Sequence, residues 1–328
     1  MRKEQKHLKP LFDTVRKDLD KFDSLLERDL YADSDLVQNI IDHLLEKRGK
    51  RLRPTFLFLT ARCCGMTHRK MVEAALSIEL IHTATLLHDD VVDQADRRRG
   101  QSTVNAEWTN TISVLMGDFL FAKAFRLLVS TKCPKLIERV AETTEIVSVG
   151  ELRQIEECGN FDLSEDTYLD IIAAKTASLF ATSAAAGPLL NKSTSREVSR
   201  LAEFGKKVGI SFQIADDLLD LVGDVKKTGK EVGNDLVQGK ATLPLIHALR
   251  TSSRKVRDEI TAILSNGSRP SHYRKVVDFI GNSGGIEYAR ASAARFGEEA
   301  LKLIHRYGKS RYYNAIEEVV NFTVNREN

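Results

Sequence analysis

Residues 70–92 read KMVEAALSIELIHTATLLHDDVV, and this stretch decides the fold class of the chain. Apolar side chains lie on most sides of a helix drawn through it, and two adjacent acids, Asp89 and Asp90, lie near its C-terminal end. A helix that is apolar nearly all round is covered by other elements of the protein. We therefore expect residues 70–92 to form a central helix that is buried on most sides.

Helical spacing of apolar residues continues on both sides of this segment. With only 6 Pro and 19 Gly in 328 residues, and no strand-like alternation of useful length, the chain favours long helices over a turn-rich β fold. The sequence predicts an all-α fold in a single domain, residues 1–328. The further helices are expected at about 8–30, 36–47, 111–130, 134–157, 165–186, 195–221, 241–265, 270–282, 286–306 and 310–322.

Local signals mark where these helices begin and end. Ser164 precedes two acids, and Thr194 or Ser195 precedes Glu197, which is typical of helix N-termini. We expect breaks at Gly187–Pro188 and in the glycine-rich stretch 223–239, among others.

The charge and cysteine content exclude several classes of protein. Lys and Arg total 49 against 46 Asp and Glu, a net charge of +3, which is too balanced for a protein that binds nucleic acid along an extended basic surface. The four cysteines form no CxxC pair, so structural zinc and a disulfide framework are disfavoured and a reducing cytosol is favoured. The N-terminus has no apolar signal region, and no run of 18 apolar residues occurs, so we expect neither secretion nor a transmembrane segment.

The segment HDDVVDQADRRRG, residues 88–100, carries the first candidate site. Asp89 and Asp93 are four residues apart, so both carboxylates project from one helical face about a turn apart. Two carboxylates held together repel each other, and a hard divalent cation relieves that repulsion.

A second acidic cluster occurs in FQIADDLLD, residues 212–220. Asp216 and Asp220 repeat the four-residue spacing, and Gln213 lies one turn earlier on the same face. One such cluster is more often a solvated cap or an ion-pair donor than a metal site. Two clusters, each at the end of an apolar helix, favour metal binding, because acids gain nothing there without a cation between them.

Basic residues accompany the acids. GKRLRP, residues 49–54, places Lys50, Arg51 and Arg53 in an expected loop between Gly49 and Pro54. Mg²⁺ held by carboxylates, with Lys and Arg in nearby loops, makes a diphosphate site. Each base taken singly is equally explained as a solvated charge, which we favour for Arg51, Arg97 and Lys227. Lys230 and Lys240 lie in the glycine-rich stretch after the second cluster.

Two polar residues on apolar helices remain open to two interpretations. His82 precedes Asp89 by two helical turns and is either a satisfied core residue or a ligand contact. Lys175, followed by Thr176 in an apolar run, either extends along the surface or reaches an anion at the mouth of a cavity.

Taken in order, GKRLRP, HDDVVD with RRRG, Lys175–Thr176, FQIADDLLD and the GK…D…GKATLP segment resemble the motifs of the trans-isoprenyl diphosphate synthases, or polyprenyl synthetases, of the long-chain, octaprenyl type. The resemblance covers about residues 45–245. It implies a bundle of long antiparallel helices around a deep central cavity with both acidic motifs at its mouth. It also implies head-to-tail condensation of isopentenyl diphosphate with an allylic diphosphate.

The resemblance also implies the site residues. Three Mg²⁺ ions are expected, two at Asp89 and Asp93 and one at Asp216, and we include Asp220 among the metal ligands. Asp89, Asp93, Asp216 and Lys175 are the expected catalytic residues. Isopentenyl diphosphate is expected at Lys50, Arg53, His82 and Arg99, and the allylic substrate at Arg98, Lys175, Thr176, Gln213, Lys230 and Lys240.

Product length is inferred from the residues before the first acid. In the family, aromatic residues four and five positions before that acid form a floor and shorten the product. Here these positions are Thr85 and Ala84, both small, which predicts a long product of octaprenyl type, as for a quinone side chain. Phe121, Phe125 and Leu128 on the next helix are candidates for the floor.

Several alternatives stay open. A short-chain farnesyl or geranylgeranyl diphosphate synthase is disfavoured by the small residues Ala84 and Thr85, and a non-catalytic subunit by the presence of every matched acid and base. A terpene cyclase is disfavoured by the intact GKRLRP segment. We expect a cytoplasmic homodimer.

Overall fold

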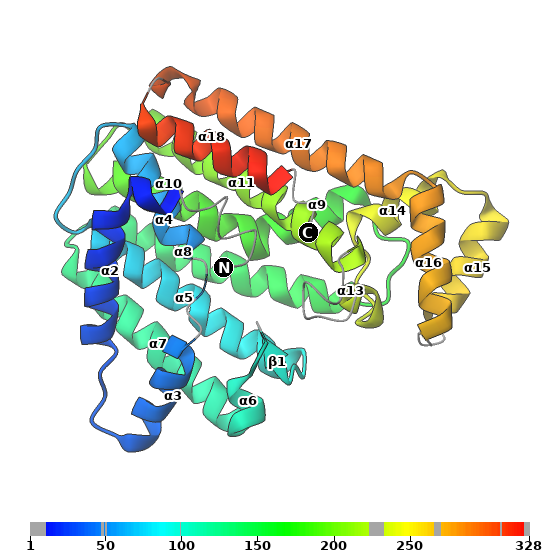
Figure 1. Cartoon of the computed structure of the whole chain (residues 1–328), viewed down its shortest axis with the longest axis horizontal. Helices are drawn as coiled ribbons and strands as arrows, with labels where there is room; N and C mark the ends of the chain where they lie inside the picture. The colour runs from blue at the N-terminus through cyan, green and yellow to red at the C-terminus, as the bar shows by residue number, and fades with distance from the viewer. Residues whose placement is uncertain are drawn as a thin grey trace. The chain divides into compact units, whose positions relative to one another are not determined.

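The computed structural model describes residues 11–46, 49, 51–98, 100–222, 233–265, 270–308 and 310–324, with side chains except at 270–273 and 322–324. Among these residues the chain is built from helices (Figure 1). The strands in this part of the chain are β1 (Arg97–Arg98) and β2 (Gln101–Ser102), a two-residue antiparallel pair. The predicted all-α class is confirmed.

The chain forms two compact units. Unit 1 comprises Met1–Thr144, Leu179–Ala202 and His305–Glu318, and unit 2 comprises Glu145–Ser178, Glu203–Ile304 and Val319–Asn328. Helices α8 (Pro134–Glu156), α10 (Ser178–Leu190), α11 (Ser195–Val222) and α18 (Arg311–Val324) contribute residues to both units. A single domain around one deep cavity stays a prediction.

Unit 1 is organised around α5 (Met71–Val92), which contacts α2 (Arg16–Asp29), α4 (Leu52–Cys63) and α7 (Asn110–Ser130). Half of the residues of α5 are buried, on several sides of the helix, which confirms the predicted central helix. The unit also contains α3 (Asp35–Glu46), α6 (Val104–Glu107) and the 3₁₀ turn η2 (His305–Tyr307).

In unit 1 the C-terminal end of α5 contacts the first turns of α7, as in an antiparallel pair. The Ser113 hydroxyl donates to the Leu87 carbonyl at 3.0 Å. Gly117 of α7 lies against the His88 ring, because a Cβ there would come within 2.2 Å of His88 Nε2. This contact fixes the end of α5 just before its acidic residues.

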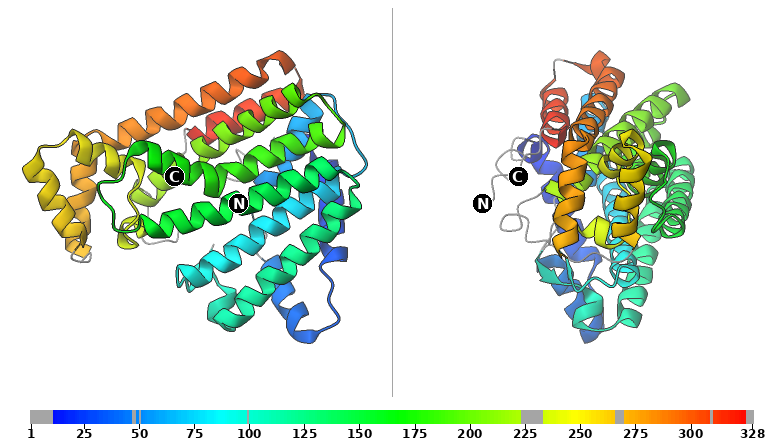
Figure 2. Two further views of the ribbon diagram at one scale, coloured as in Figure 1. Left: turned by 180° about the vertical axis from the view of Figure 1, so that it is seen from behind. Right: turned by 90° about the vertical axis from the view of Figure 1, so that its right-hand side faces the viewer.

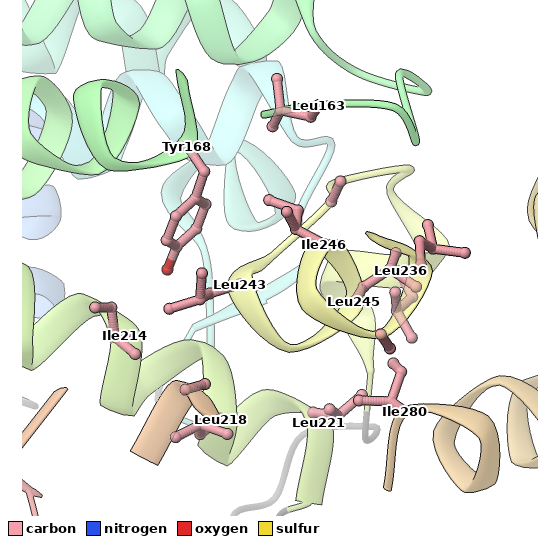
Figure 3. Packing of buried hydrophobic residues seen from close by; sticks show 14 of the residues in the cluster. Leu163, Tyr168, Ile214, Leu218, Leu221, Leu236, Leu243, Leu245, Ile246 and Ile280 are labelled. Carbon is pink, nitrogen blue, oxygen red and sulfur yellow. The ribbon is translucent and has the colours of Figure 1, made fainter. Parts of the chain in front are cut away.

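Unit 2 has its own apolar core, which includes buried residues of α9 (Glu165–Ile172), α11, α13 (Asn234–Val237), α14 (Leu243–Thr251) and α17 (Gly285–Ile304) (Figure 3). Helices α15 (Arg254–Ser265) and α16 (Pro270–Asn282) lie side by side in this unit (Figure 2), joined by the Lys275–Glu259 ion pair at 2.5 Å.

The run Glu165–Leu190 consists of α9, a π-helical turn η1 (Ala173–Ala177) and α10. By length and hydropathy it is the one helix among the described residues that could cross a membrane, but 67% of its most apolar window is buried. Such burial is what the core helix of a folded domain shows.

Three expectations about element boundaries were wrong. Residues 52–63 form α4, so Arg53 is helical, because Pro54 lies in the first turn, where the missing N–H has no intrahelical partner to lose. Pro188 lies inside α10, two residues before its end, instead of breaking it. The helix expected at 241–265 is two helices, α14 and α15, separated at Ser252–Ser253.

The predicted N-caps are present. The Ser164 hydroxyl accepts from the Thr167 N–H at 3.0 Å, and the Thr194 hydroxyl accepts from the Glu197 N–H at 3.3 Å. Both satisfy helix N–H groups that have no partner within their helix.

Candidate active site

The first acidic motif lies at the end of α5 in unit 1. Asp89 and Asp93 are half-buried, and the Asp93 N–H closes the last turn by donating to the Asp89 carbonyl at 2.7 Å. The two outer acids of the motif are therefore held one helical turn apart on an ordered helix end, with partial access to solvent.

The middle acid of this motif behaves differently. The Asp90 side chain is 5% exposed, and the Arg98 Nε donates to its Oδ1 at 2.6 Å. Arg98 comes from β1, and the hairpin is joined to α3, where the Ser102 carbonyl lies 2.9 Å from His43 Nε2. The buried Asp90 thus pairs with a half-buried Arg98. The predicted contact of Arg98 with the allylic substrate stays a prediction.

The residues expected to hold isopentenyl diphosphate are described in part. Lys50 and Arg99 lie outside the described residues. Arg53 is on α4, with its guanidinium 4.9 Å from the Phe180 ring centroid, and His82 is half-buried on the neighbouring α5. The expectation that Arg51 is a solvated charge was wrong, because it pairs with Asp23 at 2.5 Å and its side chain is only 21% exposed.

The second acidic motif lies near the end of α11 in unit 2. Asp216 is exposed and Asp220 is half-buried. The Asp220 Oδ2 accepts from the Asp235 N–H at 3.0 Å, and the Asp220 carbonyl accepts from Gly233. Asp220 thus also anchors the start of α13 to α11.

Again the middle acid is buried. Asp217 is 6% exposed, and its two oxygens accept from the Tyr168 hydroxyl at 2.6 Å and the Gln213 amide at 2.7 Å. Burial and then the charge of Asp235 raise the pKa of Asp217 well above its usual value, and burial followed by the charge of Asp217 raises the pKa of Tyr168.

A cavity of about 130 Å³ opens beside Asp217 within unit 2. The structure brings together here four of the residues predicted to contact the allylic substrate, and Lys230 lies outside the described residues. The cavity wall includes Lys175, Thr176, Gln213 and Lys240, together with Tyr168, Asp217 and Asp235. It joins two ammonium groups to hydrogen-bonding side chains, which suits a phosphate group.

Local structure presents Lys175 and Thr176 to this cavity. Both lie in the π-helical turn η1, a departure from α geometry that is frequent at functional sites. The Lys175 ammonium pairs with Glu151 of α8 at 2.5 Å, and the Thr176 hydroxyl donates to Gln213 Oε1 at 2.7 Å.

Gly150 permits the close approach of α8 to this turn. A Cβ on Gly150 would lie 2.7 Å from Ala174 Cβ and 2.9 Å from the Lys175 backbone nitrogen. Any larger residue must therefore displace the backbone of the turn that carries Lys175.

Sequence reasoning gave no role to Tyr168, Glu151, Asp235 or Gly150. Asp235 lies in the GK…D…GKATLP segment, so its place in the motif was a signal. Tyr168 and Gly150 are ordinary residues within helical patterns, and their roles depend on contacts between different helices.

The residues proposed for chain-length control all lie in unit 1. Ala84 is fully buried, and Thr85 is half-buried with its hydroxyl donating to the His82 carbonyl at 2.8 Å. Phe125 is 40% exposed on the outer face of α7. Their roles stay predictions.

The donors at both motifs fit a hard divalent cation. The accessible side chains are carboxylates, and in the described part of the chain no three His, Cys, Asp or Glu residues are gathered into a complete cage. Mg²⁺ is commonly bound by one or two carboxylates with water and substrate phosphates, rather than by an all-protein cage. Asp89, Asp93, Asp216 and Asp220 are the residues that would hold it.

The chain belongs to the polyprenyl synthetase family, whose model matches residues 34–280. It is similar to octaprenyl diphosphate synthase of Escherichia coli K12, with 32% identity over 98% of this chain and 99% of that protein. It is also similar to component 2 of heptaprenyl diphosphate synthase from Geobacillus stearothermophilus, with 37% identity over 90% of this chain and 92% of that protein.

Among solved structures, the polyprenyl synthase of Caulobacter crescentus CB15, complexed with calcium and isoprenyl diphosphate, resembles this chain with a TM-score of 0.92 and 33% identity. The likeness covers 97% of this chain and 98% of that one. The chain is thus a trans-polyprenyl diphosphate synthase, an enzyme that transfers prenyl groups.

Proposed function

We propose that this enzyme adds isopentenyl diphosphate repeatedly to an allylic diphosphate and releases a long, octaprenyl-type all-trans product. The observation that carries the chain length is the pair of small residues on α5, Ala84 and Thr85, one helical turn before Asp89. One turn is about 5.4 Å, so α5 itself carries no aromatic ring at these two positions below the first motif. The similarity to an octaprenyl diphosphate synthase over nearly the full length supports the same product class.

The reaction is a head-to-tail condensation. The carbon–oxygen bond of the allylic diphosphate breaks, and the diphosphate leaves with the electron pair. The double bond of isopentenyl diphosphate attacks the allylic cation, and loss of a proton to the released diphosphate completes one five-carbon addition. Groups that stabilise the departing negative charge accelerate the first step.

The two cavity lysines and their neighbours serve this step in the proposal. Lys175 and Lys240 neutralise the allylic diphosphate, and Thr176 and Gln213 orient it, because all four line the cavity of unit 2. Lys50, Arg53, His82 and Arg99 hold isopentenyl diphosphate. Arg98 and Lys230 are the remaining residues proposed to contact the allylic diphosphate.

Three Mg²⁺ ions per site are proposed, two at Asp89 and Asp93 and one at Asp216 with Asp220. Bound Mg²⁺ supplies positive charge to the phosphate oxygens. The helix end at Asp93 and the contact of Asp220 with Asp235 hold the carboxylates in place before substrate arrives.

We also propose a cytoplasmic homodimer whose product serves as a quinone side chain. The exposed apolar residues Val114, Leu115, Phe125 and Val129 along α7 support self-association. The four cysteines are all free thiols, which suits a reducing compartment.

A condensation assay tests the activity. The full chain is incubated with farnesyl diphosphate and labelled isopentenyl diphosphate, with and without Mg²⁺. We expect label to enter the acid-labile allylic fraction only with Mg²⁺, and activity lost to a chelator to return when Mg²⁺ is restored. A chain that never incorporates label alone, but does so with a second protein, would instead be a subunit of a two-component enzyme.

A further inference from the structure

Tyr168 is a buried phenol that the proposed reaction does not yet use. It is 4% exposed and lies in the core of unit 2, where its ring points from α9 toward Ile214 and Leu243 (Figure 3). A hydroxyl in such apolar surroundings requires a hydrogen-bond partner. The partner is Asp217 Oδ2, at 2.6 Å.

This contact begins a chain of hydrogen bonds that reaches the turn η1. Asp217 Oδ1 accepts from Gln213 Nε2 at 2.7 Å, and Gln213 Oε1 accepts from the Thr176 hydroxyl at 2.7 Å. The Gln213 amide has one donating and one accepting end, so the carboxylate at one end determines which atom faces Thr176.

Each link is short and the groups are largely shielded from water. Asp217 is 6% exposed and Thr176 is 9% exposed. Water therefore competes little for these bonds, and a change at one end is passed along the chain. Lys175 is the neighbour of Thr176 in η1, so the same series of hydrogen bonds also stabilises the turn that carries the Lys175 ammonium group.

We propose that Tyr168 is a positioning residue for the allylic diphosphate: through Asp217 and Gln213 it orients Thr176 and the Lys175 turn toward the cavity. Its ring lines the cavity, but its only hydroxyl proton is directed to Asp217. This inference rests on the proposed function of the cavity, because it assumes that the diphosphate binds there.

The structure offers a matched control in the same unit. The Tyr288 hydroxyl also donates to a carboxylate, that of Glu165, at 2.8 Å. Tyr288 stacks on His247 with ring centroids 3.9 Å apart and does not line the cavity beside Asp217. Removing the Tyr288 hydroxyl makes the same chemical change but leaves the hydrogen bonds from Tyr168 to Thr176 intact.

The experiment compares Tyr168→Phe with Tyr288→Phe in the full chain with Mg²⁺. For Tyr168→Phe we expect KM for the allylic diphosphate to rise about tenfold and kcat to fall by a similar factor, with KM for isopentenyl diphosphate unchanged. For Tyr288→Phe we expect both KM values to stay at the wild-type level. A purely structural role for Tyr168 would lower the active fraction and leave both KM values unchanged, which overturns the proposal.

A double-mutant cycle tests the route of the effect. If Tyr168 acts through Gln213 and Thr176, Tyr168→Phe should add less than threefold to the allylic KM of Thr176→Val, because the far end of the chain is already missing. Fully multiplicative effects contradict the route. So does a Tyr168→Phe chain that fails to fold, since the hydroxyl is then needed for stability itself. An inactive wild-type enzyme in the same assay defeats the proposed function instead.

Discussion

The three acids of each motif divide into accessible and buried side chains. In both motifs the first and last acids are at least partly exposed, and the middle acid is buried and hydrogen-bonded within the protein. Asp90 pairs with a guanidinium, and Asp217 accepts from a phenol and an amide. The outer acids are thus accessible from solvent, and the middle ones support the helix ends.

This division predicts different outcomes for neighbouring substitutions. Asp89→Asn and Asp216→Asn should each lower kcat by orders of magnitude with little change in melting temperature, because they remove charge at accessible positions. Asp90→Asn should lower the melting temperature, because it weakens the ion pair between this buried carboxylate and the half-buried Arg98. Steady-state kinetics and thermal denaturation of the three variants measure both effects.

The three variants serve as controls for one another, because the outer acids and the middle acid should differ in their effects on turnover and on melting temperature. Near-normal turnover of either outer variant would remove that residue from the metal site. An Asp90→Asn protein as stable as wild type would show that the pair with Arg98 contributes little to folding.

At the scale of elements, the turn η1 depends on the helix beside it. Gly150 on α8 lies against the backbone of residues 174 and 175, and Glu151 pairs with Lys175. The position of Lys175, the lysine proposed to bind the diphosphate, is therefore set by α8 at two points.

Gly150→Ala tests this dependence. We expect the added methyl group to displace the turn, raise KM for the allylic diphosphate and destabilise the fold by about 1–3 kcal/mol, the usual cost of overpacking. Gly159→Ala is a useful comparison for space alone, since nothing lies within 4 Å of a Cβ there, although its φ of +81° adds backbone strain. An unchanged allylic KM in Gly150→Ala would show that the turn tolerates the shift.

The helix α5 carries the prediction about product length. Ala84→Phe should shorten the product, and because Ala84 is fully buried it should also lower the melting temperature. Thr85→Phe, at a half-buried position, should shorten the product with a smaller loss of stability. Sizing the dephosphorylated products of both variants checks this, and an unchanged distribution would exclude both positions from the floor.

Element patterns also show what the sequence could predict. The apolar pattern of residues 70–92 was enough to predict the central helix. The four-residue spacing of acids at helix ends was enough to predict the two acidic motifs. Helix α4 was missed because Pro54 was taken as a helix breaker, although the first turn tolerates proline. The roles of Tyr168 and Gly150 could not be predicted, because they depend on contacts of α9 with α11 and of α8 with η1 that no local pattern encodes.

At the scale of the whole molecule, the exposed apolar face of α7 predicts self-association. Leu115 is 61% exposed and Val129 is 63% exposed, and Phe125 lies on the same face. We expect light scattering to give a mass twice that of the monomer. Leu115→Glu should shift this mass toward that of the monomer, because a charge buried in the interface opposes association. Leu36→Glu, on α3 and also exposed, should leave the mass unchanged. A wild-type monomer would contradict the homodimer.

We propose that this protein builds a long prenyl chain without a second subunit. The most direct test is to incubate it with Mg²⁺, farnesyl diphosphate and excess labelled isopentenyl diphosphate, and then to size the dephosphorylated products. We expect a dominant product of octaprenyl length. Products that stop at geranylgeranyl length, or the absence of any condensation by the chain alone, would contradict it.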